Sequence, residues 1–294
     1  MPEIDLHTHS TASDGSYTPE DLIAAAKKAG LKAIALTDHD TVRGLDRASK
    51  AAREAGIEFI PGCELTVTHA ELRFHLVALW LPLDAVEIRD TLDDIIRNRN
   101  ERNHVIIGKL NNLGIDLSYD DVLAKAGDGA VGRPHFATAL LEKGYVNSTQ
   151  DAFDRYLGSN GKAYEPKKVL TSEHALDLLH RHGATTVLAH PYQIGLGKDE
   201  LASLAMELKD MGLGAIEAYY TEHSPSQTRS FLELAKRLDL GVSGGSDFHG
   251  SIKPDIKLGT GRGRLDIPYS VLADLKKRRL DKGQPTETTP SVLF

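Results

Sequence analysis

The strongest constraint on the fold of this chain is a repeated alternation of short apolar runs with amphipathic segments of helical period. Each apolar run, such as "LKAIALTDHD" at residues 31–40, ends in polar residues. The intervening segments carry helix signals: residues 18–30 have Thr18 as a cap, Pro19 in the first turn and Gly30 at the exit. Strand and helix alternating in this way predict a parallel sheet, and the number of strands favours a closed barrel.

The same alternation continues along the chain. Further strands are expected at residues 3–9, 57–65, 184–191, 213–220 and 240–250, and further helices at residues 45–56, 172–183, 200–212 and 225–239. Two neighbouring apolar runs at residues 64–69 and 73–81 predict a hairpin or adjacent strands.

One long segment breaks the alternation. Residues 84–168 contain helical patterns at 88–114, from Ser118 onward, at 133–144 and at 149–158, with no strand pattern among them. We therefore expect a barrel built from residues 1–83 and 169–294, with an all-helical insertion domain at 84–168. Placed at the carboxyl ends of the strands, such an insertion would form a lid or wall over the site.

Composition excludes several classes of protein. The chain has 294 residues and 40% hydrophobic content, enough for one large core or two domains. Its single cysteine, Cys63, rules out an intramolecular disulfide and a thiolate cluster, so any metal would be bound by nitrogen and oxygen. A formal charge of -7 argues against a broad surface for duplex DNA. Without a signal peptide or a long apolar run, we expect a cytoplasmic protein with no membrane partner.

The first apolar run carries two histidines at its end. His7 and His9 are two positions apart, so in a strand they project from the same face. Two imidazoles held side by side suit a metal, but two ligands leave most of a coordination sphere unfilled. Ordinary polar surface and hydrogen-bonded core histidines are the alternatives for this pair.

Histidines and carboxylates recur at the other strand ends and in the loops that follow. These residues are Asp14, Asp38, His39, Asp40, Glu64, His75, His190, Glu217, Asp247 and His249. In a parallel barrel the carboxyl ends of all strands open onto one face, so residues as distant in sequence as His7 and Asp247 converge there. Singly, each residue could be a helix cap, a core histidine or the partner of an arginine. Together they predict a metal centre.

Five motifs bring a known family to mind. "HTHSTASDGSYTP", "IALTDHDTVRG", "PGCEL", "LAHP" and "GSDFHG" resemble, in order and spacing, the motifs of the PHP (polymerase and histidinol phosphatase) superfamily. The resemblance implies a distorted (β/α)7 TIM-like barrel and a phosphoesterase centre of two or three divalent cations, Mn²⁺ in the first place, with Fe²⁺ or Zn²⁺ as alternatives. "GRPHFA" and "KAYEPKK" in the insertion resemble the TrpH/YciV branch of nucleoside 3',5'-bisphosphate phosphatases and 5'-to-3' exonucleases of short RNA.

The resemblance also implies a ligand set. A first metal would be held by His7, His9, Glu64 and Asp247; a second by Glu64 as a bridge with His75 and His190; and a third by Asp14, His39 and His249. The residue types suit this chemistry, because a carboxylate can bridge two cations and imidazoles can complete each sphere. Sites built from nitrogen and oxygen ligands all bind divalent metals in the same general order of affinity, so the ligand types alone do not identify the metal.

Hydrolysis of a phosphate ester makes definite demands on such a centre. Cations lower the pKa of a bridging water, so that hydroxide exists near neutral pH and attacks phosphorus, and they neutralise the phosphoryl oxygens. Asp247 and His249 count as catalytic because they belong to this centre. His223 in "YYTEHSP" is the candidate acid for the leaving alkoxide, and a surface histidine is its alternative.

Substrate anchoring is expected from the insertion. In "GDGAVGRPHFA" a glycine-rich approach leads to a helix start, which places Arg133, His135 and backbone N-H groups where a phosphate could dock. Arg133 could instead pair with a barrel carboxylate. In "RNRNER", Arg99 and Arg102 are three positions apart and therefore neighbours on one helix, so both could face the site. A run of charged residues on a helix is more often simply its solvent-exposed face, which is the alternative. Asp40 is a further candidate for contact with substrate.

We therefore expect a metal-dependent phosphoric monoester hydrolase. It would remove the 3'-phosphate of nucleoside 3',5'-bisphosphates, leave the 5'-nucleotide, and also trim short 5'-phosphorylated oligonucleotides. Its expected partners are small phosphorylated nucleotides and short RNA, and nothing in the sequence indicates a protein partner. A histidinol phosphate phosphatase and a non-catalytic, metal-stabilised PHP module are the alternatives, and the intact ligand set disfavours the second.

Overall fold

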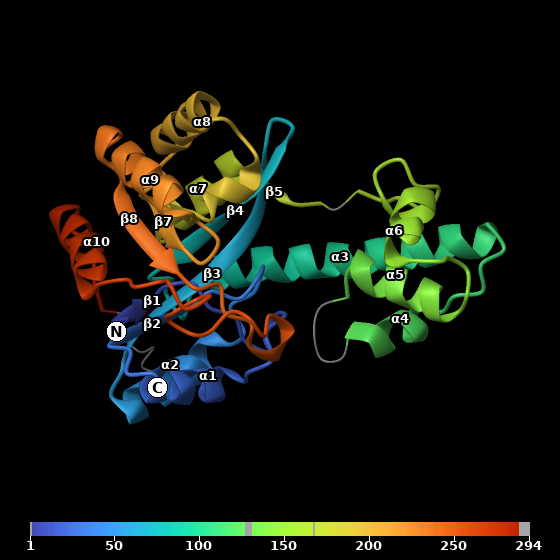
Figure 1. Cartoon of the computed structure of the whole chain (residues 1–294), viewed down its shortest axis with the longest axis horizontal. Helices are drawn as coiled ribbons and strands as arrows, with labels where there is room; N and C mark the ends of the chain where they lie inside the picture. Colours follow the sequence, from blue (N-terminus) through green and yellow to red (C-terminus); the bar gives the residue numbers. More distant parts are fainter. Residues whose placement is uncertain (1, 127–130, 167, 288–294) are drawn as a thin grey trace. The chain divides into compact units, whose positions relative to one another are not determined.

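The computed structural model describes residues 2–126, 131–166 and 168–287 and divides into two compact units (Figure 1). The first, called the barrel unit, comprises Met1–Asp90 and Leu170–Phe294. The second, called the insertion unit, comprises Thr91–Val169. The sequence-based boundaries were 1–83 with 169–294 for the barrel and 84–168 for the insertion.

Among the described residues, eight strands form the sheet of the barrel unit. They are β1 (Ile4–Asp5), β2 (Ala33–Leu36), β3 (Glu58–His69), β4 (Leu72–Leu79), β5 (Leu170–Thr171), β6 (Thr185–Leu188), β7 (Ala215–Tyr220) and β8 (Gly241–Gly245). Their order is β1-β2-β3-β4-β6-β7-β8, and the short β5 pairs with β3 beside this path. The α/β barrel expected from the sequence is confirmed.

The helices of the barrel unit follow its strands along the chain. They are α1 (Pro19–Lys28), α2 (Leu45–Ala55), α7 (Ser172–Arg181), α8 (Lys198–Asp210), α9 (Pro225–Arg237) and α10 (Tyr269–Asp281), with short 3-10 turns at Pro191–Ile194 and Gly250–Ile252. α1 begins as predicted, because the Thr18 side chain accepts a hydrogen bond from the Asp21 N-H. Gly30 beyond its end has φ +81°, which glycine adopts without strain.

The sheet is mixed, because β4 runs antiparallel to both β3 and β6. Only residues 70 and 71 separate β3 from β4, and such a short turn reverses the chain, whereas parallel neighbours need a long crossover. The prediction of a parallel sheet is therefore wrong at β4, and the hairpin is confirmed. The runs expected at residues 57–65 and 64–69 belong to the single strand β3.

The barrel closes between β8 and β1 by a few contacts in place of a continuous ladder. The Leu6 N-H donates to the Gly244 carbonyl at 3.1 Å, and the Asp247 N-H donates to the His7 carbonyl at 2.9 Å. A Cβ on Gly245 would lie 2.2 Å from the His7 Cβ, so only glycine permits this approach.

The buried carboxylate of Asp5 forms hydrogen bonds across this closure. Asp5 accepts hydrogen bonds from the Ser246 N-H at 2.9 Å, the Ser246 hydroxyl at 2.5 Å and the Gly259 N-H at 2.8 Å. Burial raises the pKa of Asp5, and these hydrogen bonds oppose that shift. The beginning of the chain is thus joined to two loops near its other end.

The core of the barrel unit extends from the strand interior onto α10. Leu272 and Leu275 of α10 are almost fully buried against Ile4, Ile60 and Leu79. Arg279, further along the helix, lies with its guanidinium carbon 4.7 Å from the centre of the Trp80 ring. No helix was expected from the sequence at residues 269–281, so α10 was not predicted.

The insertion unit has a hydrophobic core of its own. Its helices are α3 (Val86–Asn112, which starts in the barrel unit), α4 (Tyr119–Ala126), α5 (Arg133–Glu142) and α6 (Thr149–Ala152), followed by a π-helical turn at Phe153–Leu157. Ile106, Leu110, Phe136, Leu140 and Leu157 are buried in this core. No helix among the residues that the structure describes combines the length and the apolar character needed to cross a membrane.

Candidate metal centre

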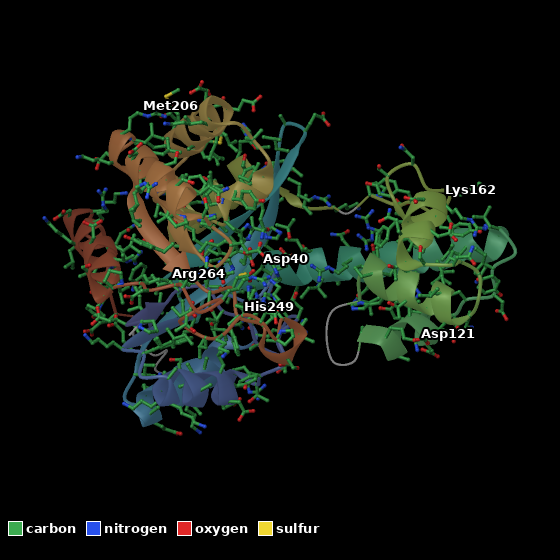
Figure 2. The ribbon with its side chains drawn as sticks, viewed as in Figure 1. Asp40, Asp121, Lys162, Met206, His249 and Arg264 are labelled. Carbon is green, nitrogen blue, oxygen red and sulfur yellow. The ribbon has the colours of Figure 1, made fainter. Side chains whose placement is uncertain are left out.

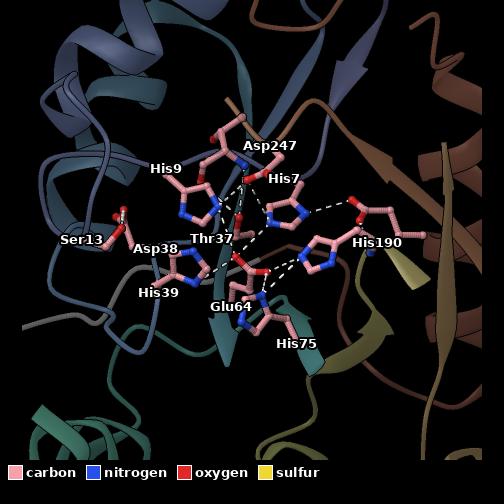
Figure 3. A network of polar contacts seen from close by, with 12 residues as sticks. His7, His9, Ser13, Thr37, Asp38, His39, Glu64, His75, His190 and Asp247 are labelled. Carbon is pink, nitrogen blue, oxygen red and sulfur yellow. Dashed lines mark hydrogen bonds and ion pairs between the residues drawn. The ribbon is translucent and has the colours of Figure 1, made fainter. Parts of the chain in front are cut away.

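Histidine and carboxylate side chains from widely separated parts of the chain point toward one another at one end of the barrel (Figure 3). His7 and His9 follow β1, His39 follows β2, Glu64 lies in β3, His75 lies in β4, His190 follows β6, and Asp247 follows β8. The convergence predicted from the strand ends is thus present in the structure.

Glu64 lies at the middle of this cluster. Its Oε2 atom is 3.1 Å from His7 Nε2, 3.3 Å from His9 Nε2 and 3.1 Å from His39 Nδ1. The side chain of Glu64 is only 1% exposed, so the negative charge is compensated by its neighbours and not by water.

The other oxygen of Glu64 faces a second group of imidazoles. Its Oε1 atom is 2.7 Å from His75 Nδ1 and 2.9 Å from His190 Nε2. Because each oxygen has its own set of nitrogen atoms, this carboxylate has the arrangement needed to bridge two cations.

Asp247 also divides its two oxygens between different neighbours. Oδ1 lies 3.2 Å from His9 Nε2 and 3.4 Å from His249 Nδ1. Oδ2 accepts hydrogen bonds from the Tyr220 hydroxyl at 3.0 Å and the Lys253 ammonium at 2.8 Å. One oxygen therefore faces the histidines while the other is held by donors.

Asp14 completes the cluster on its more open side. Its Oδ1 atom is 3.3 Å from His249 Nε2 and 3.8 Å from His9 Nδ1, and its Oδ2 atom is 3.9 Å from His39 Nε2. Asp14 is half exposed, unlike His9 and His249, which are buried.

Within the part of the chain that the structure describes, three groups of potential ligand atoms each fall within 4.8 Å of one another. They are His7 with His9, Glu64 and Asp247; His9 with Asp14, His39 and His249; and His39 with Glu64 and His75. The first group matches the residues expected for the first metal. The second contains the three expected for the third metal and adds His9, and the third places His39 beside Glu64 and His75. His190 joins that third region through its 2.9 Å approach to Glu64.

The donor atoms themselves indicate that the residues fit divalent cations. His7 Nε2, both ring nitrogens of His9 and Glu64 Oε2 are buried, and apart from their close approaches to one another and to Asp14, His39 and Asp247 they form no hydrogen bond among the described residues. Buried polar atoms in proteins are almost always paired, so atoms that lack a partner and converge on one point require another explanation. Imidazole and carboxylate are suitable ligands for Mn²⁺, Fe²⁺ and Zn²⁺, and cations between these atoms would satisfy all four.

The same groups strongly perturb one another's ionisation. Burial alone would lower the pKa of His7 and His9, but the surrounding carboxylates raise the pKa of His7 well above its usual value and that of His9 to about 9. Burial would raise the pKa of Glu64 and Asp247, yet neighbouring histidines hold both pKa values well below the usual range. Positive charge among these carboxylates is therefore strongly favoured, as a proton or as a cation.

His39 differs from the other two histidines in its ionisation. Burial lowers the pKa of His39 to about 3, and the attraction of Glu64 does not reverse this shift. A neutral imidazole is the form that binds metals, so His39 is ready to act as a ligand without losing a proton.

Glu217 orients two of the expected ligands from behind. Its Oε1 atom is 2.9 Å from His7 Nδ1, and its Oε2 atom accepts the backbone N-H of His190 at 2.6 Å. A carboxylate can only accept, so Nδ1 of His7 carries the proton and Nε2 faces Glu64. The sequence analysis noted Glu217 without a role, although a charged residue inside the apolar run "GAIEAYY" is itself a signal.

A network of hydroxyl groups fixes the loop that follows β1. Asp38 accepts hydrogen bonds from the Ser10 N-H at 2.7 Å, the Ser10 hydroxyl at 2.7 Å and the Ser13 hydroxyl at 2.6 Å. A Cβ on Gly15 would lie 2.5 Å from the His9 carbonyl oxygen, so this loop also requires glycine. Asp38 thereby supports His9 and Asp14 without contacting the cluster itself.

Three residues at the strand ends have backbone angles that are unusual for non-glycine residues. His190 has φ +26°, Asp247 has φ +59° and Asp40 has φ +51°. Such strain concentrates at functional sites and persists only where surrounding contacts enforce it. Asp40 is buried and its Oδ1 accepts the Thr66 N-H at 3.0 Å, so it supports β3, and its contact with substrate stays a prediction.

The candidate acid His223 lies one layer away from the cluster. Its ring is 5.1 Å from that of Tyr220 and 4.7 Å from that of Phe231, and its Nδ1 atom is 3.0 Å from the Ala218 carbonyl oxygen. Its Nε2 atom is buried, and burial lowers the pKa of His223. Lys253 and Tyr220, which the sequence analysis did not select, contact Asp247 directly. They come from an irregular loop and an apolar strand end, which carry no motif.

Arg133 and His135 occupy the start of α5 in the insertion unit. The Arg133 Nη1 donates to the Leu157 carbonyl at 2.9 Å, and the guanidinium lies 5.5 Å from the centre of the Tyr164 ring. His135 Nδ1 accepts the Gly132 N-H at 3.0 Å. Both residues thus have structural contacts of their own, and their binding of phosphate stays a prediction. Most of the glycine-rich approach, residues 127–130, lies outside the described residues.

Arg99 and Arg102 lie on α3 within the same unit. Arg102 is buried, and its Nη2 donates to Asn103 Oδ1 at 3.0 Å. Asn103 in turn donates to the Val131 carbonyl at 3.1 Å, just before α5. Arg102 thus belongs to the packed interior of this unit and not to a solvated face, and the role of both arginines toward substrate stays a prediction.

The chain is similar to known proteins along most of its length. The PHP domain family model matches residues 5–145. A 5'-3' exoribonuclease of Salmonella typhimurium, Rnm, is 34% identical over 269 residues, which cover 91% of this chain and 90% of the relative. A 3',5'-nucleoside bisphosphate phosphatase of Chromobacterium violaceum is 31% identical over 250 residues, which cover 85% of this chain and 88% of the relative.

A solved structure agrees with these relatives. The crystal structure of a protein from Bifidobacterium adolescentis, assigned as a metal-dependent phosphoesterase, has a TM-score of 0.75 and 29% identity, and covers 94% of this chain and 96% of that one. Barrel, cluster and relatives together define a metal-dependent phosphoesterase and not a non-catalytic module. The chain belongs to the PHP family.

Proposed function

We propose that the chain hydrolyses the 3'-phosphate of nucleoside 3',5'-bisphosphates and releases the 5'-nucleotide. The observation that carries this proposal is the convergence of buried, unpartnered donor atoms on Glu64. The similarity to the Chromobacterium violaceum 3',5'-nucleoside bisphosphate phosphatase supports this substrate.

The nine expected ligands would hold two or three divalent cations. They are His7, His9, Asp14, His39, Glu64, His75, His190, Asp247 and His249. Mn²⁺ is our first candidate, with Fe²⁺ and Zn²⁺ as alternatives. Bound there, such cations would neutralise phosphoryl oxygens and lower the pKa of a nearby water.

The surrounding side chains prepare the centre for a phosphate ester. Glu217 fixes the ring of His7, and the hydroxyl network on Asp38 fixes the loop that carries Asp14. Lys253 is 39% exposed while its ammonium lies 2.8 Å from Asp247, so it offers a positive charge to an incoming phosphoryl oxygen beside the ligands. His223 remains our candidate acid, and its buried Nε2 would have to become accessible for that role.

A second, non-reacting phosphate would be recognised by the insertion unit. Arg133 uses one nitrogen for the Leu157 carbonyl and keeps other N-H groups, and the N-H groups of the first turn of α5 lie beside it. Binding energy from such a remote phosphate positions the reacting ester, so it raises the rate as well as the affinity.

Trimming of short RNA from its 5' end is the second candidate activity. It is favoured by the 34% identity with the exoribonuclease of Salmonella typhimurium. Both activities follow from one layout, in which the 5'-phosphate is held away from the cations and the next phosphate along the chain reacts. A bisphosphate offers a monoester at that position, and an oligonucleotide offers a diester.

Product analysis with adenosine 3',5'-bisphosphate and Mn²⁺ tests the proposal. We expect inorganic phosphate and adenosine 5'-monophosphate, with faster turnover than for adenosine 3'-monophosphate, because the remote phosphate is missing from the latter. Release of the 5'-phosphate, or equal turnover of the two substrates, would contradict the proposal. Histidinol phosphate should be assayed in parallel, since its preferential hydrolysis would establish the alternative activity.

A further inference from the structure

Two adjoining cavities lie beside the metal centre within the barrel unit. The smaller has a volume of about 320 Å³ and is lined by residues that include Gln193, Tyr220, Lys253 and Arg262. The larger has a volume of about 910 Å³, and its lining also includes Tyr220 and Arg262. The two cavities share these residues and therefore adjoin, and we call them together the Tyr220 groove.

The Tyr220 groove begins at a ligand of the proposed metal centre. The Tyr220 hydroxyl and the Lys253 ammonium both bond to Oδ2 of Asp247, and both residues line the smaller cavity. Asp247 thus separates the cluster from the groove, and a strand bound at the cluster would reach the groove by passing Lys253, which is 39% exposed. Substrates as small as a bisphosphate would leave most of its volume empty.

The walls of the groove combine aromatic rings with cations. Tyr192 lines the larger cavity and is 51% exposed, which is unusual for a large aromatic side chain. Tyr219 lies on the same wall. Arg264, labelled in Figure 2, is exposed, and among the described residues its side chain has no hydrogen bond or ion pair. Exposed aromatic rings beside a guanidinium group are features that bind single-stranded nucleic acids.

Carboxylates also line this path and limit its positive charge. Arg262 pairs with Glu222 at 3.5 Å and with Asp255 at 3.6 Å, through side chains that are all more than one-third exposed. Exposed pairs of this kind are weak, so Arg262 can exchange them for a phosphate. Asp266 lines the larger cavity as well, so stacking would contribute more than net charge.

We propose that the Tyr220 groove binds the nucleotides on the 3' side of the scissile bond in single-stranded RNA. This inference rests on the proposed trimming activity: the bond between phosphorus and the 3'-oxygen of the first nucleotide breaks, that nucleotide leaves, and the remaining strand, which keeps the phosphate, is assigned a place on the barrel. Tyr192 stacks on a base, Arg264 contacts a phosphate, and Lys253 marks the entrance next to Asp247. Single-stranded RNA is favoured over a protein partner because the groove starts at the reacting centre and pairs rings with guanidinium groups.

The first experiment measures binding without catalysis. A fluorescent, 5'-phosphorylated pentauridylate is titrated with the full chain in the presence of a metal chelator, and Kd is followed by anisotropy at several salt concentrations. We expect Tyr192→Ala to raise Kd about 5- to 20-fold, the lower part of the range for a lost stacking contact, and Arg264→Ala to raise Kd by a similar factor through loss of a phosphate contact. Arg264→Ala should also reduce the slope of log K against log salt by about 0.7, as for one phosphate contact on a single strand.

The control is Arg229→Ala, an arginine of α9 that is exposed and does not line either cavity. Its Kd should equal that of the unmodified chain. Equal Kd values for Tyr192→Ala, Arg264→Ala and the unmodified chain would overturn the inference, because the groove would then not bind RNA.

The second experiment compares substrates of increasing length. In the unmodified chain, kcat/KM should rise from the dinucleotide to longer 5'-phosphorylated RNA, and the two groove variants should lower kcat/KM for the pentanucleotide about 5- to 20-fold more than for adenosine 3',5'-bisphosphate. Values of kcat/KM that do not change with RNA length would overturn the inference that the groove binds RNA and leave the phosphatase proposal intact. Binding of RNA with the expected variant effects, but no hydrolysis of either substrate, would support the groove and overturn the proposed function.

Discussion

Glu64 shows how a single buried side chain can organise a whole site. Five imidazoles approach its two oxygens within 3.3 Å: those of His7, His9, His39, His75 and His190. Carboxylates in such surroundings lose hydration that only nearby positive charge can replace. The charge of Glu64, and not its shape alone, is therefore the property that the site requires.

Replacing Glu64 by glutamine tests this requirement. Glu64→Gln preserves the size of the side chain but removes the shared negative charge, so we expect loss of bound metal and a fall in kcat of at least ~100-fold. Elemental analysis of the purified protein and phosphate release from the bisphosphate measure the two effects. Glu54→Gln, an exposed glutamate of α2, is the control and should alter neither. Unchanged metal content in Glu64→Gln would show that the centre is assigned wrongly.

Arg133 carries the second prediction at this scale. Arg133→Ala should weaken substrates with two phosphates more than those with one, by roughly 1.5 to 3 kcal/mol, as for a hydrogen bond to a charged group. The measurement is kcat/KM for adenosine 3',5'-bisphosphate against adenosine 3'-monophosphate. Lys162→Ala, an exposed cation in the same unit, is the control. Equal losses for both substrates would mean that Arg133 only supports the fold through Leu157.

At the scale of elements, the sequence was informative where local signals and packing agree. Thr18, Pro19 and Gly30 mark α1 correctly, because caps and turns depend on nearby residues. The direction of β4 depends on the length of the turn after His69, which an apolar pattern does not reveal. The convergence of strand ends predicted which histidines and carboxylates lie together, and their role as ligands stays a prediction. Tyr220 and Lys253 contact Asp247 without any sequence motif to indicate it.

The helix that the sequence analysis missed offers a test of its own. Leu272 of α10 is fully buried in the barrel core, so Leu272→Ala should lower the free energy of unfolding by about 2 to 5 kcal/mol. Leu280 of the same helix is 62% exposed, and Leu280→Ala should change it by less than about 0.5 kcal/mol. Chemical denaturation of both variants measures the difference. Similar values would mean that α10 does not complete the core.

At the scale of the whole molecule, the centre links strands from both segments of the barrel unit. Ligands that bind only the folded chain stabilise it by RT ln(1 + [L]/Kd), which is about 2.7 kcal/mol at a hundredfold excess over Kd. Chelation should therefore lower the Tm of the unmodified chain and leave that of Glu64→Gln nearly unchanged. Differential scanning calorimetry with and without Mn²⁺ measures this. The same Tm under both conditions would show that the cations do not stabilise the fold.

The hydrogen bonds from Ser246 and Gly259 to Asp5 have a consequence for biosynthesis. They close the barrel between a residue of the first strand and two loops that follow β8, so the second partner is synthesised more than 200 residues after the first. Contacts of such long sequence separation form late and slow folding, because a large loop must be ordered before they are gained. Until β8 leaves the ribosome, the nascent chain carries His7, His9 and Glu64 without Asp247 to complete their group. We therefore expect the complete group of ligand atoms to form only after β8 has joined the sheet, so that tight metal binding follows folding of the barrel.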